Sequence, residues 1–140
     1  MLCSEIMRNP VKWVSDDDTA MIAARVMRDE NIGFLPVCDK SGRVIGTLTD
    51  RDLAMRLVAE NIPAETHVRD IMSKNPVRCS PNDEIQAAEQ LMGTQHKSRI
   101  VCTDDEGHLL GVVSIADIAK HDDGWRVART VRKITSREVR

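Results

Sequence analysis

The sequence predicts a mixed α/β (α+β) fold made of two β-α-β-β-α units that pack as a pseudo-twofold pair. The first observation is a repeat: the stretch 42–54, GRVIGTLTDRDLA, recurs 65 positions later at 107–119 as GHLLGVVSIADIA. Such self-similarity is typical of duplicated folding units. The second observation is the order of elements, which is the same around both copies. A unit of about 50 residues buries too little apolar surface to be comfortably stable alone, so we expect the two to pack together.

The first unit is predicted to span residues 5–60. Asn9-Pro10 ends a short helical turn, because proline disfavours helix in the residue before it. The acidic stretch 15–19 supplies helix-capping side chains, and consecutive carboxylates fit a cap better than a metal site. Gly33 is the expected C-terminal cap of that helix. The predicted elements are a strand at 11–14, a helix from about 20 to 30, strands at 34–38 and 44–49 joined by a turn, and a helix from 50 to about 59 that buries Leu53, Leu57 and Val58.

The second unit repeats this order. Residues 61–70 contain Pro63 and are the predicted linker, and the second unit spans 71–121. Asn75-Pro76 repeats Asn9-Pro10, and 81–84 open the next helix. The predicted elements that follow are a helix whose apolar face is Ile85, Ala88, Leu91 and Met92, strands at 99–103 and 109–114, and a helix from 115 to about 121.

The tail, 122–140, differs from both units in its charge. Six basic and three acidic residues give it a net charge of +3, and Val127, Val131 and Ile134 fall at helical spacing. One interpretation is an amphipathic helix that packs on a partner subunit. The other is a solvated basic tail that contacts nucleic acid or an acidic partner. The spacing favours the packed helix.

Composition limits the classes of protein to which the chain can belong. Of 140 residues, 41% are hydrophobic and 30% charged, and the net charge is -2. This balance argues against disorder and against a global basic field for nucleic acid. No apolar run is long enough for a transmembrane helix, and the N-terminus lacks the order of a signal peptide. We therefore expect a cytoplasmic protein without a membrane partner.

The metal-ligating residue types show no metal-binding pattern. The four cysteines form no CxxC, and the four histidines form no i,i+4 pair. Zinc or disulfide roles stay open for the cysteines, but buried reduced thiols fit a cytosolic chain better. We expect no metal.

The repeated motif has the sequence pattern [ST]-x-x-D, as Thr49 with Asp52 and as Ser114 with Asp117. Each copy stands where a strand is followed by a helix. In one interpretation it is a helix capping box. In the other, the carboxylate one turn into the helix accepts hydrogen bonds from both hydroxyls of a ribose, as an acidic residue does in dinucleotide folds. The two interpretations are compatible, because capping holds the carboxylate in place.

Several further features accompany this motif in a fixed order. They are Asn-Pro, a helix ending in Met, Leu35-Pro36-Val37, Gly42-x-x-x-Gly46 and Thr49-Asp50-Arg51-Asp52. Together they resemble a cystathionine-beta-synthase (CBS) domain, and the second half resembles a second copy. The pair, about residues 5 to 121, is similar to a Bateman module, in particular to small stand-alone prokaryotic CBS proteins.

The resemblance implies a site for an adenosine-containing ligand: AMP, ADP, ATP, S-adenosylmethionine or NAD. It places the ribose on Thr49 and Asp52 and on Ser114 and Asp117. It places phosphate on basic residues just before the first hairpin strand, which are Arg99 and its neighbour Lys97 in the second unit. The matching position in the first unit is the uncharged Phe34, where Arg51 is either a substitute phosphate ligand or part of a surface ion pair.

The adenine is expected in apolar clefts between the two halves. The candidate residues are Val11, Trp13, Leu35, Pro36 and Val112 for one cleft and Val77, Ile100, Val101 and Thr47 for the other, although each is more typical of an ordinary core. The centre of the second motif, Ile115-Ala116, lacks the charge of Asp50-Arg51, so the two clefts need not bind the same ligand.

The function expected from these features is that of a non-catalytic sensor. The nucleotide is a regulatory ligand and not a cofactor, and its binding is transmitted to a dimer arrangement or a protein partner. The resemblance implies a homodimer. The sequence has none of the GxGxxG, GxxxxGK[ST], GxSxG or HExxH motifs of enzymes. The alternatives are an oligomeric stress or interaction protein with empty clefts, and a regulator that contacts nucleic acid through the basic tail.

Overall fold

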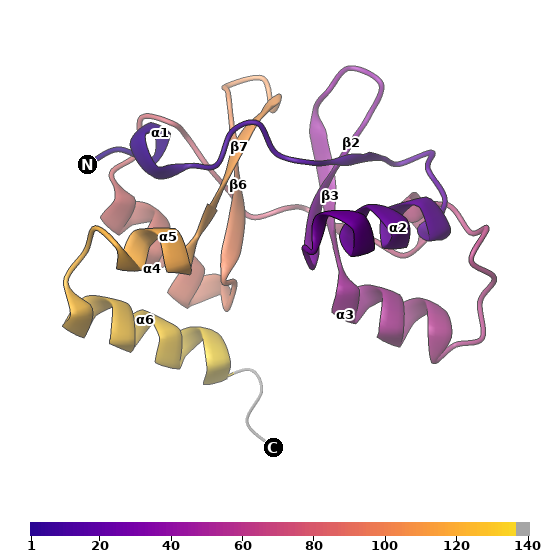
Figure 1. Cartoon of the computed structure of the whole chain (residues 1–140). Coiled ribbons are helices and arrows are strands. Elements are labelled where there is room, and N and C mark those ends of the chain that lie inside the picture. Colours follow the sequence, from indigo (N-terminus) through magenta and orange to yellow (C-terminus); the bar gives the residue numbers. More distant parts are fainter. Residues whose placement is uncertain (137–140) are drawn as a thin grey trace. The chain divides into compact units, whose positions relative to one another are not determined.

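The computed structural model describes residues 1–136, which form two compact units (Figure 1). The first unit comprises Lys12–Pro76 and Glu106–Leu109. The second unit comprises Met1–Val11, Val77–Asp105 and the chain from Leu110 onward. The tail residues Arg137, Glu138 and Arg140, which contribute to the predicted basic charge, lie outside the described residues.

The sheet of the first unit has four strands in the order β1-β2-β3-β4. β1 pairs in parallel with β2, and the other pairs are antiparallel. Alternate residues of the hairpin, such as Leu35, Val37 and Leu48, are buried against Ala23 and Met27 of α2. The strands are β1 (Val14–Ser15), β2 (Phe34–Cys38), β3 (Val44–Thr49) and β4 (Ser73–Lys74), and the main helix is α2 (Ala20–Glu30). The first strand is therefore shorter than the predicted 11–14 and begins three residues later.

Both ends of α2 are capped by side chains or backbone conformations that the sequence encodes locally. The Thr19 hydroxyl accepts a hydrogen bond from the Ile22 amide at 3.2 Å, as a side-chain N-cap does. At the other end Asn31 adopts the left-handed conformation with φ 54°. Asparagine tolerates this region better than most residues, so it ends the helix two residues before Gly33. The prediction of Gly33 as the cap was wrong.

The helix after β3 begins as α3 (Asp50–Asp52) and continues as a π-helix, η1 (Leu53–Val58). The Ala59 amide donates to the carbonyl of Ala54, five residues earlier. A π-helical turn contains more residues than an α-helical one, so the buried face shifts. Leu57 is buried, but Val58 is 73% exposed, contrary to the inward face predicted for it.

The short segment that precedes each repeat packs on the unit formed by the other repeat. α1 (Cys3–Ile6) belongs to the second unit, whereas the 3-10 helix η2 (Val68–Asp70) and β4 belong to the first. Glycines make these contacts possible. A Cβ on Gly111 would lie 2.6 Å from the Arg8 carbonyl oxygen, and one on Gly46 would lie 2.8 Å from that of Ser73. The two glycines of the repeat are thus places where backbones approach closely.

The second unit repeats the layout with a three-stranded sheet, β5-β6-β7. Its core combines sheet residues such as Ile100 and Val113 with Met92 and Ile118 from the helices. The strands are β5 (Arg78–Cys79), β6 (Arg99–Thr103) and β7 (Leu109–Ser114), and the helices are α4 (Ile85–Gln95), α5 (Ile115–Ala119) and α6 (Gly124–Thr135).

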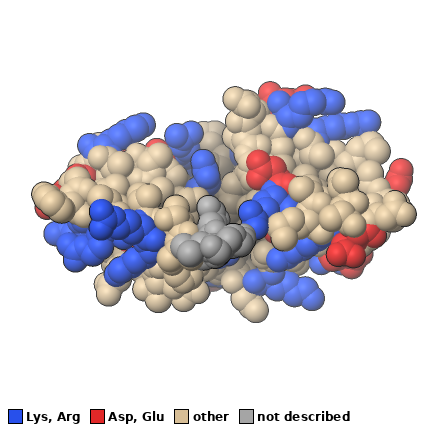
Figure 2. All heavy atoms as spheres, turned by 90° about the horizontal axis from the view of Figure 1, so that it is seen from below, with Lys and Arg blue, Asp and Glu red and all other residues tan. Residues whose placement is uncertain are grey.

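The tail helix α6 lies alongside α4 of the same chain (Figure 1). Ile134 is buried in the core, and the Thr130 hydroxyl donates to Glu89 Oε1 at 2.8 Å. An amphipathic helix forms as the spacing predicts. Of its predicted apolar face, Val127 and Ile134 pack into its own unit, whereas Val131 is 40% exposed. Lys and Arg side chains gather over α6, at the left of Figure 2.

All four cysteines are buried free thiols. Within residues 1–136 no group of three or more His, Cys, Asp or Glu side chains could hold a metal ion. No helix in this range is long and apolar enough to cross a membrane.

Candidate ligand-binding site

Both [ST]-x-x-D motifs lie at the junction between the second strand of a hairpin, β3 or β7, and the helix that follows it. The Thr49 hydroxyl accepts from the Asp52 amide at 3.1 Å, and the Ser114 hydroxyl accepts from the Asp117 amide at 3.0 Å. Each hydroxyl residue is therefore the N-cap of a short helix. The capping interpretation holds for both copies, and it fixes each Asp one turn into its helix.

The Asp117 carboxylate has a partner at each oxygen. The Ser114 hydroxyl donates to Oδ2 at 2.7 Å, and the Arg8 guanidinium lies 3.4 Å from Oδ2 and 3.5 Å from Oδ1. Burial to 7% exposure raises the cost of ionising Asp117, but the bonds from Ser114 and Arg8 outweigh it and lower the pKa of this carboxyl. Asp117 is thus an oriented anion that accepts hydrogen bonds at neutral pH.

The Asp52 carboxylate is held differently. Its Oδ2 accepts from the backbone amide of Thr49 at 3.0 Å, which completes a capping box. Arg56, one turn further along the helix, lies 3.7 Å from Oδ1. Asp52 is therefore tied to local backbone, whereas Asp117 is held by side chains. The two copies share the motif but not its environment.

Basic residues flank the second motif at the start of β6. The Ile115 amide donates to the Ser98 carbonyl at 2.9 Å, which joins the helix start to the loop before Arg99. Arg99 and Lys97 are exposed. The same bond in the first unit runs from Asp50 to Gly33, but Phe34 there carries no charge and pairs with Thr49. The structure thus brings Arg99 to the Asp117 junction and gives the Asp52 junction no equivalent.

Arg51 lies on the exposed side of α3. Its backbone amide donates to its neighbour Asp50 at 2.8 Å. No ion pair of its side chain occurs within the part of the chain that the structure describes, so the surface ion pair considered from sequence is not formed there.

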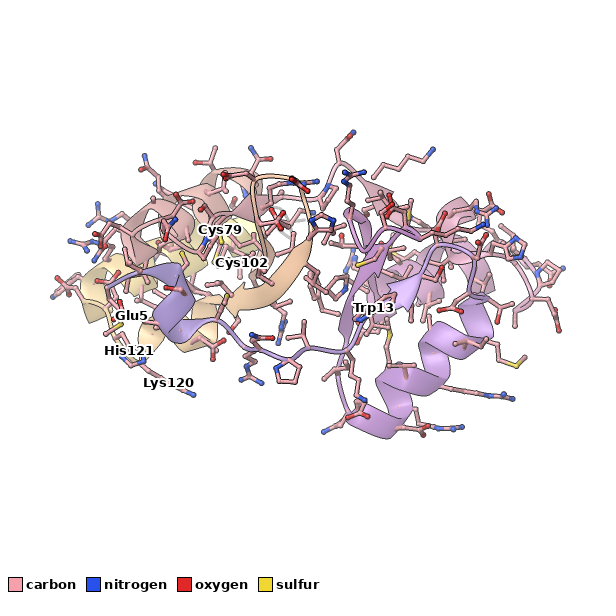
Figure 3. The ribbon with its side chains drawn as sticks, turned by 90° about the horizontal axis from the view of Figure 1, so that it is seen from above. Glu5, Trp13, Cys79, Cys102, Lys120 and His121 are labelled. Carbon is pink, nitrogen blue, oxygen red and sulfur yellow. The ribbon has the colours of Figure 1, made fainter. Side chains whose placement is uncertain are left out.

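The apolar candidates divide by burial, and Val101 and Val112 are buried. Leu35 and Ile100 are fully buried members of the two cores, and Pro36 is buried beside Leu35. Val11 and Val77 are half-buried, and Trp13 (labelled in Figure 3) is half exposed. The exposed surface suited to a base is therefore offered by Val11, Trp13 and Val77.

Arg8 is absent from the site predicted from sequence, although it contacts Asp117. It comes from the extended segment after α1, which lies beside β7 through a bridge between Arg8 and Val112. One signal was available in the sequence. A basic residue precedes Asn-Pro in both copies, as Arg8 before Asn9-Pro10 and as Lys74 before Asn75-Pro76.

Comparison with known proteins gives a family match over most of the chain. The family model described as the CBS domain matches twice, at residues 3–59 and 68–124. CBS domain-containing protein YhcV of Bacillus subtilis is 36% identical over 115 residues, covering 82% of this chain and 81% of the relative. Hypoxic response protein 1 of Mycobacterium tuberculosis is 32% identical over 133 residues, covering 94% and 92%.

Solved structures show the same fold. Hypoxic Response Protein I with two coordinated zinc ions has a TM-score of 0.80 at 29% identity, covering 88% of this chain and 100% of that chain. The CBS domain pair of protein MJ0100 in complex with 5-methylthioadenosine and S-adenosyl-L-methionine has a TM-score of 0.77 at 24% identity, covering 86% and 94%. CBSX2 in complex with AMP has a TM-score of 0.73 at 19% identity, covering 85% and 93%. The predicted fold class is confirmed.

Proposed function

This chain belongs to the CBS domain family, and from that premise we propose that it is a regulatory module that binds an adenosine-containing ligand at Asp117 of the second unit. The observation that carries the proposal is the Asp117 carboxylate, which is oriented by Ser114 and accompanied by Arg8. A carboxylate has two oxygens, so it can accept from both hydroxyls of a ribose at once.

The basic residues around Asp117 extend the site toward a phosphate or carboxylate. Arg8 and Arg99 supply guanidinium groups, which pair with such anions through two parallel hydrogen bonds. The solved pairs with the same fold that bind AMP, or methylthioadenosine and S-adenosylmethionine, support this class of ligand. Half-buried Val11 and Val77, which belong to the same unit as Asp117, are our candidates for contact with the base, and Lys97 for a second cation near the phosphate. Thr49, Asp52 and Arg51 form the corresponding candidate site of the first unit.

The test is thermal unfolding of the purified protein with AMP, ADP, ATP, S-adenosylmethionine and NAD. A ligand at about 100 times its dissociation constant adds roughly 2.7 kcal/mol to stability, which is a shift of several degrees. Asp117→Asn keeps the Ser114 cap and removes the charge, so we expect it to lose most of the shift. Asp52→Asn is the matched variant for the first unit. An absence of any shift at millimolar ligand would overturn the proposal.

The same proposal covers how the module acts. Stand-alone proteins of this family are generally regulatory, and we propose that this chain is non-catalytic and takes the nucleotide as a signal. We also propose a homodimer, because η1 exposes Met55 and Val58 and the following residues expose Ile62. Four reduced thiols fit a reducing compartment, so we place the protein in the cytoplasm.

A second candidate function rests on α6. This helix presents Trp125, 83% exposed, with Arg129 and Arg132 one and two turns further along on the same side. One exposed aromatic ring beside basic side chains offers a single stacking surface for single-stranded nucleic acid. This is the contact that the regulator considered from sequence would make. Titration with a labelled oligonucleotide at two salt concentrations tests it, since phosphate contacts weaken steeply as salt rises. Binding that survives Arg129→Gln with Arg132→Gln would exclude this helix.

A further inference from the structure

Three of the four cysteines lie together in the core of the second unit. Cys79 and Cys102 are register partners in the parallel strands β5 and β6, and their side chains lie side by side in Figure 3. Cys3, from α1, belongs to the same core cluster. The Cys79 thiol lies within hydrogen-bonding reach of both Cys3 and Cys102, so it is the middle member of a three-thiol cluster. Packing alone does not require sulfur at all three positions.

We propose that Cys3 and Cys79 form a reversible disulfide when the protein meets a peroxide. In the first step the Cys3 thiolate attacks one oxygen of hydrogen peroxide and the O–O bond breaks. Cys3 becomes a sulfenic acid, and the hydroxide that is released takes up a proton and leaves as water. Cys79 sulfur then attacks Cys3 sulfur, the S–O bond breaks, and the hydroxide takes the Cys79 proton to give a second water. Two thiols and one peroxide thus give one disulfide and two waters.

Electrostatics distinguish the members of the cluster. The hydrogen bond from Cys79 lowers the pKa of Cys3 against the opposing effects of burial and nearby acids, which favours the reactive thiolate. Cys79 lowers the pKa of Cys102 in the same way, but its single S–H group donates to only one of the two sulfurs at a time. Cys38 has no such neighbour, and burial beside Asp39 raises its pKa to about 11. Cys38 is therefore an internal control that should stay reduced.

Access distinguishes Cys3 from Cys102. Cys102 lies in β6, the middle strand of its sheet, and that strand opens only when the unit unfolds. Cys3 lies on the four-residue helix α1, whose segment is bonded to the rest of the second unit through the Cys3, Ser4 and Ile85 amides and through Arg8 with Val112. A helix of one turn has less packing to lose than the middle strand of a sheet, so it opens locally at lower cost and peroxide reaches Cys3 first. The bridge to Cys79 would then fix this segment on β5.

The experiment exposes the reduced full chain to hydrogen peroxide, unfolds it, alkylates the remaining thiols and maps the peptides by mass spectrometry without reduction. We expect a Cys3–Cys79 peptide pair, two alkylated cysteines that include Cys38, and full recovery of four thiols after dithiothreitol. Four free thiols throughout, a Cys79–Cys102 bridge, or bridges through Cys38 would overturn the proposal. Thiol counts do not depend on any nucleotide, so this result is separate from the outcome at Asp117.

Two variants and one physical measurement complete the test. Cys3→Ser should leave Cys79 and Cys102 reduced under the same exposure, whereas Cys38→Ser should oxidise like the natural chain. A bridge that closes the long loop between residues 3 and 79 constrains the unfolded chain, so the oxidised protein should unfold several degrees higher than the reduced one. An unchanged midpoint in a sample that contains the mapped bridge would show that the bond does not fix the terminal segment.

Discussion

The guanidinium of Arg8 lies 3.4 Å from the carboxylate of Asp117, although the two residues are 109 positions apart in the chain. Arg8 is two-thirds exposed, with 67% of its side chain open to solvent, whereas Asp117 is buried. An arginine in this place has two possible effects on a ligand. It competes with ribose hydroxyls for the carboxylate, and it offers further N–H groups to a phosphate.

These two effects predict opposite results for two ligands. Arg8→Gln removes the positive charge of the guanidinium that would contact the phosphate. The affinity for AMP, relative to that for adenosine, should therefore fall by about tenfold. A tenfold change corresponds to about 1.4 kcal/mol, the scale of one charge-assisted hydrogen bond. Adenosine itself should bind as well or better, because Asp117 is freed. Isothermal titration of both ligands measures the ratio.

The control for Arg8 is Lys12→Gln, which removes a basic residue that pairs at 3.6 Å with Glu30 in the first unit. This variant should leave the AMP to adenosine ratio unchanged. Equal losses for AMP and adenosine in Arg8→Gln would show that Arg8 only positions the carboxylate and does not meet the phosphate.

A second prediction concerns the close backbone approach that positions Arg8. In Gly111→Ala the new methyl group would lie 2.6 Å from the Arg8 carbonyl and 2.9 Å from Met7 Sδ. Because the nearest obstacle is backbone, the segment must move away from β7, at a cost of about 1–3 kcal/mol in unfolding free energy. Urea unfolding measures the loss, and the response to ligand should weaken with it.

Gly124→Ala is the matched control for that glycine. A Cβ at Gly124, the first residue of α6, would meet no atom within 4 Å. Alanine also restricts the unfolded chain, so this variant should be neutral or more stable by roughly 0.4–1 kcal/mol. Equal destabilisation by both substitutions would mean that contact with the Arg8 segment is not the cause.

A third prediction tests the proposed dimer. Val58 and Met55 lie on the exposed side of η1, and Ile62 follows them. Val58→Asp places a charge on this apolar surface while it leaves the core intact, so the mass measured by light scattering should fall from dimer to monomer at micromolar concentration. Ala24→Asp on the exposed surface of α2 is the control. A natural chain that is already monomeric at all concentrations would refute the homodimer.

The features predicted correctly from sequence are local ones. The [ST]-x-x-D caps, the two hairpins and the helical tail each depend on residues within a few positions, and the repeat doubles the signal for the fold. Errors also have local causes. Asn31 and Gly33 are both residue types that end helices, and the helix α2 ends at Asn31, which comes earlier in the chain and adopts the left-handed conformation. The π-helical turn at η1, which exposes Val58, has no sequence signature.

The features missed from sequence depend on contacts between distant residues. The exchange of the terminal segment places α1 on the second unit, and from this follow both the pair of Arg8 with Asp117 and the cluster of Cys3 with Cys79. Likewise, the i, i+4, i+7 spacing of Val127, Val131 and Ile134 predicts an amphipathic helix, but its docking on α4 depends on the contact of Thr130 with Glu89. The spacing of apolar residues identifies the apolar face of a helix, but it does not identify the element that packs on that face.

That docking site contains a buried carboxyl pair. Glu89 is 1% exposed, and among residues 1–136 the buried atoms Glu89 Oε2 and Asp122 Oδ2 have no hydrogen-bond partner outside this pair. Desolvation, with the hydrogen bond to Asp122, raises the pKa of Glu89 to about 7 against the opposing effects of Thr130 and Arg126. The bond to Glu89 lowers the pKa of Asp122, whose carboxylate also pairs with Arg126 at 3.1 Å. One proton is therefore shared by the pair at mildly acid pH.

The shared proton makes the stability of the α6 docking depend on pH. Between the ordinary pKa of about 4.5 and the folded value of about 7, the folded state holds a proton that the unfolded state has lost, so stability falls as pH rises through this window and levels off above it. Glu89→Gln keeps an acceptor for Thr130 and a permanent donor for Asp122, so this slope should vanish and stability at pH 8 should exceed that of the natural chain. Urea unfolding from pH 5 to pH 8 measures both effects. Glu60→Gln, at an exposed carboxyl, should keep the natural slope, and a slope that survives in Glu89→Gln would assign the titration to another group.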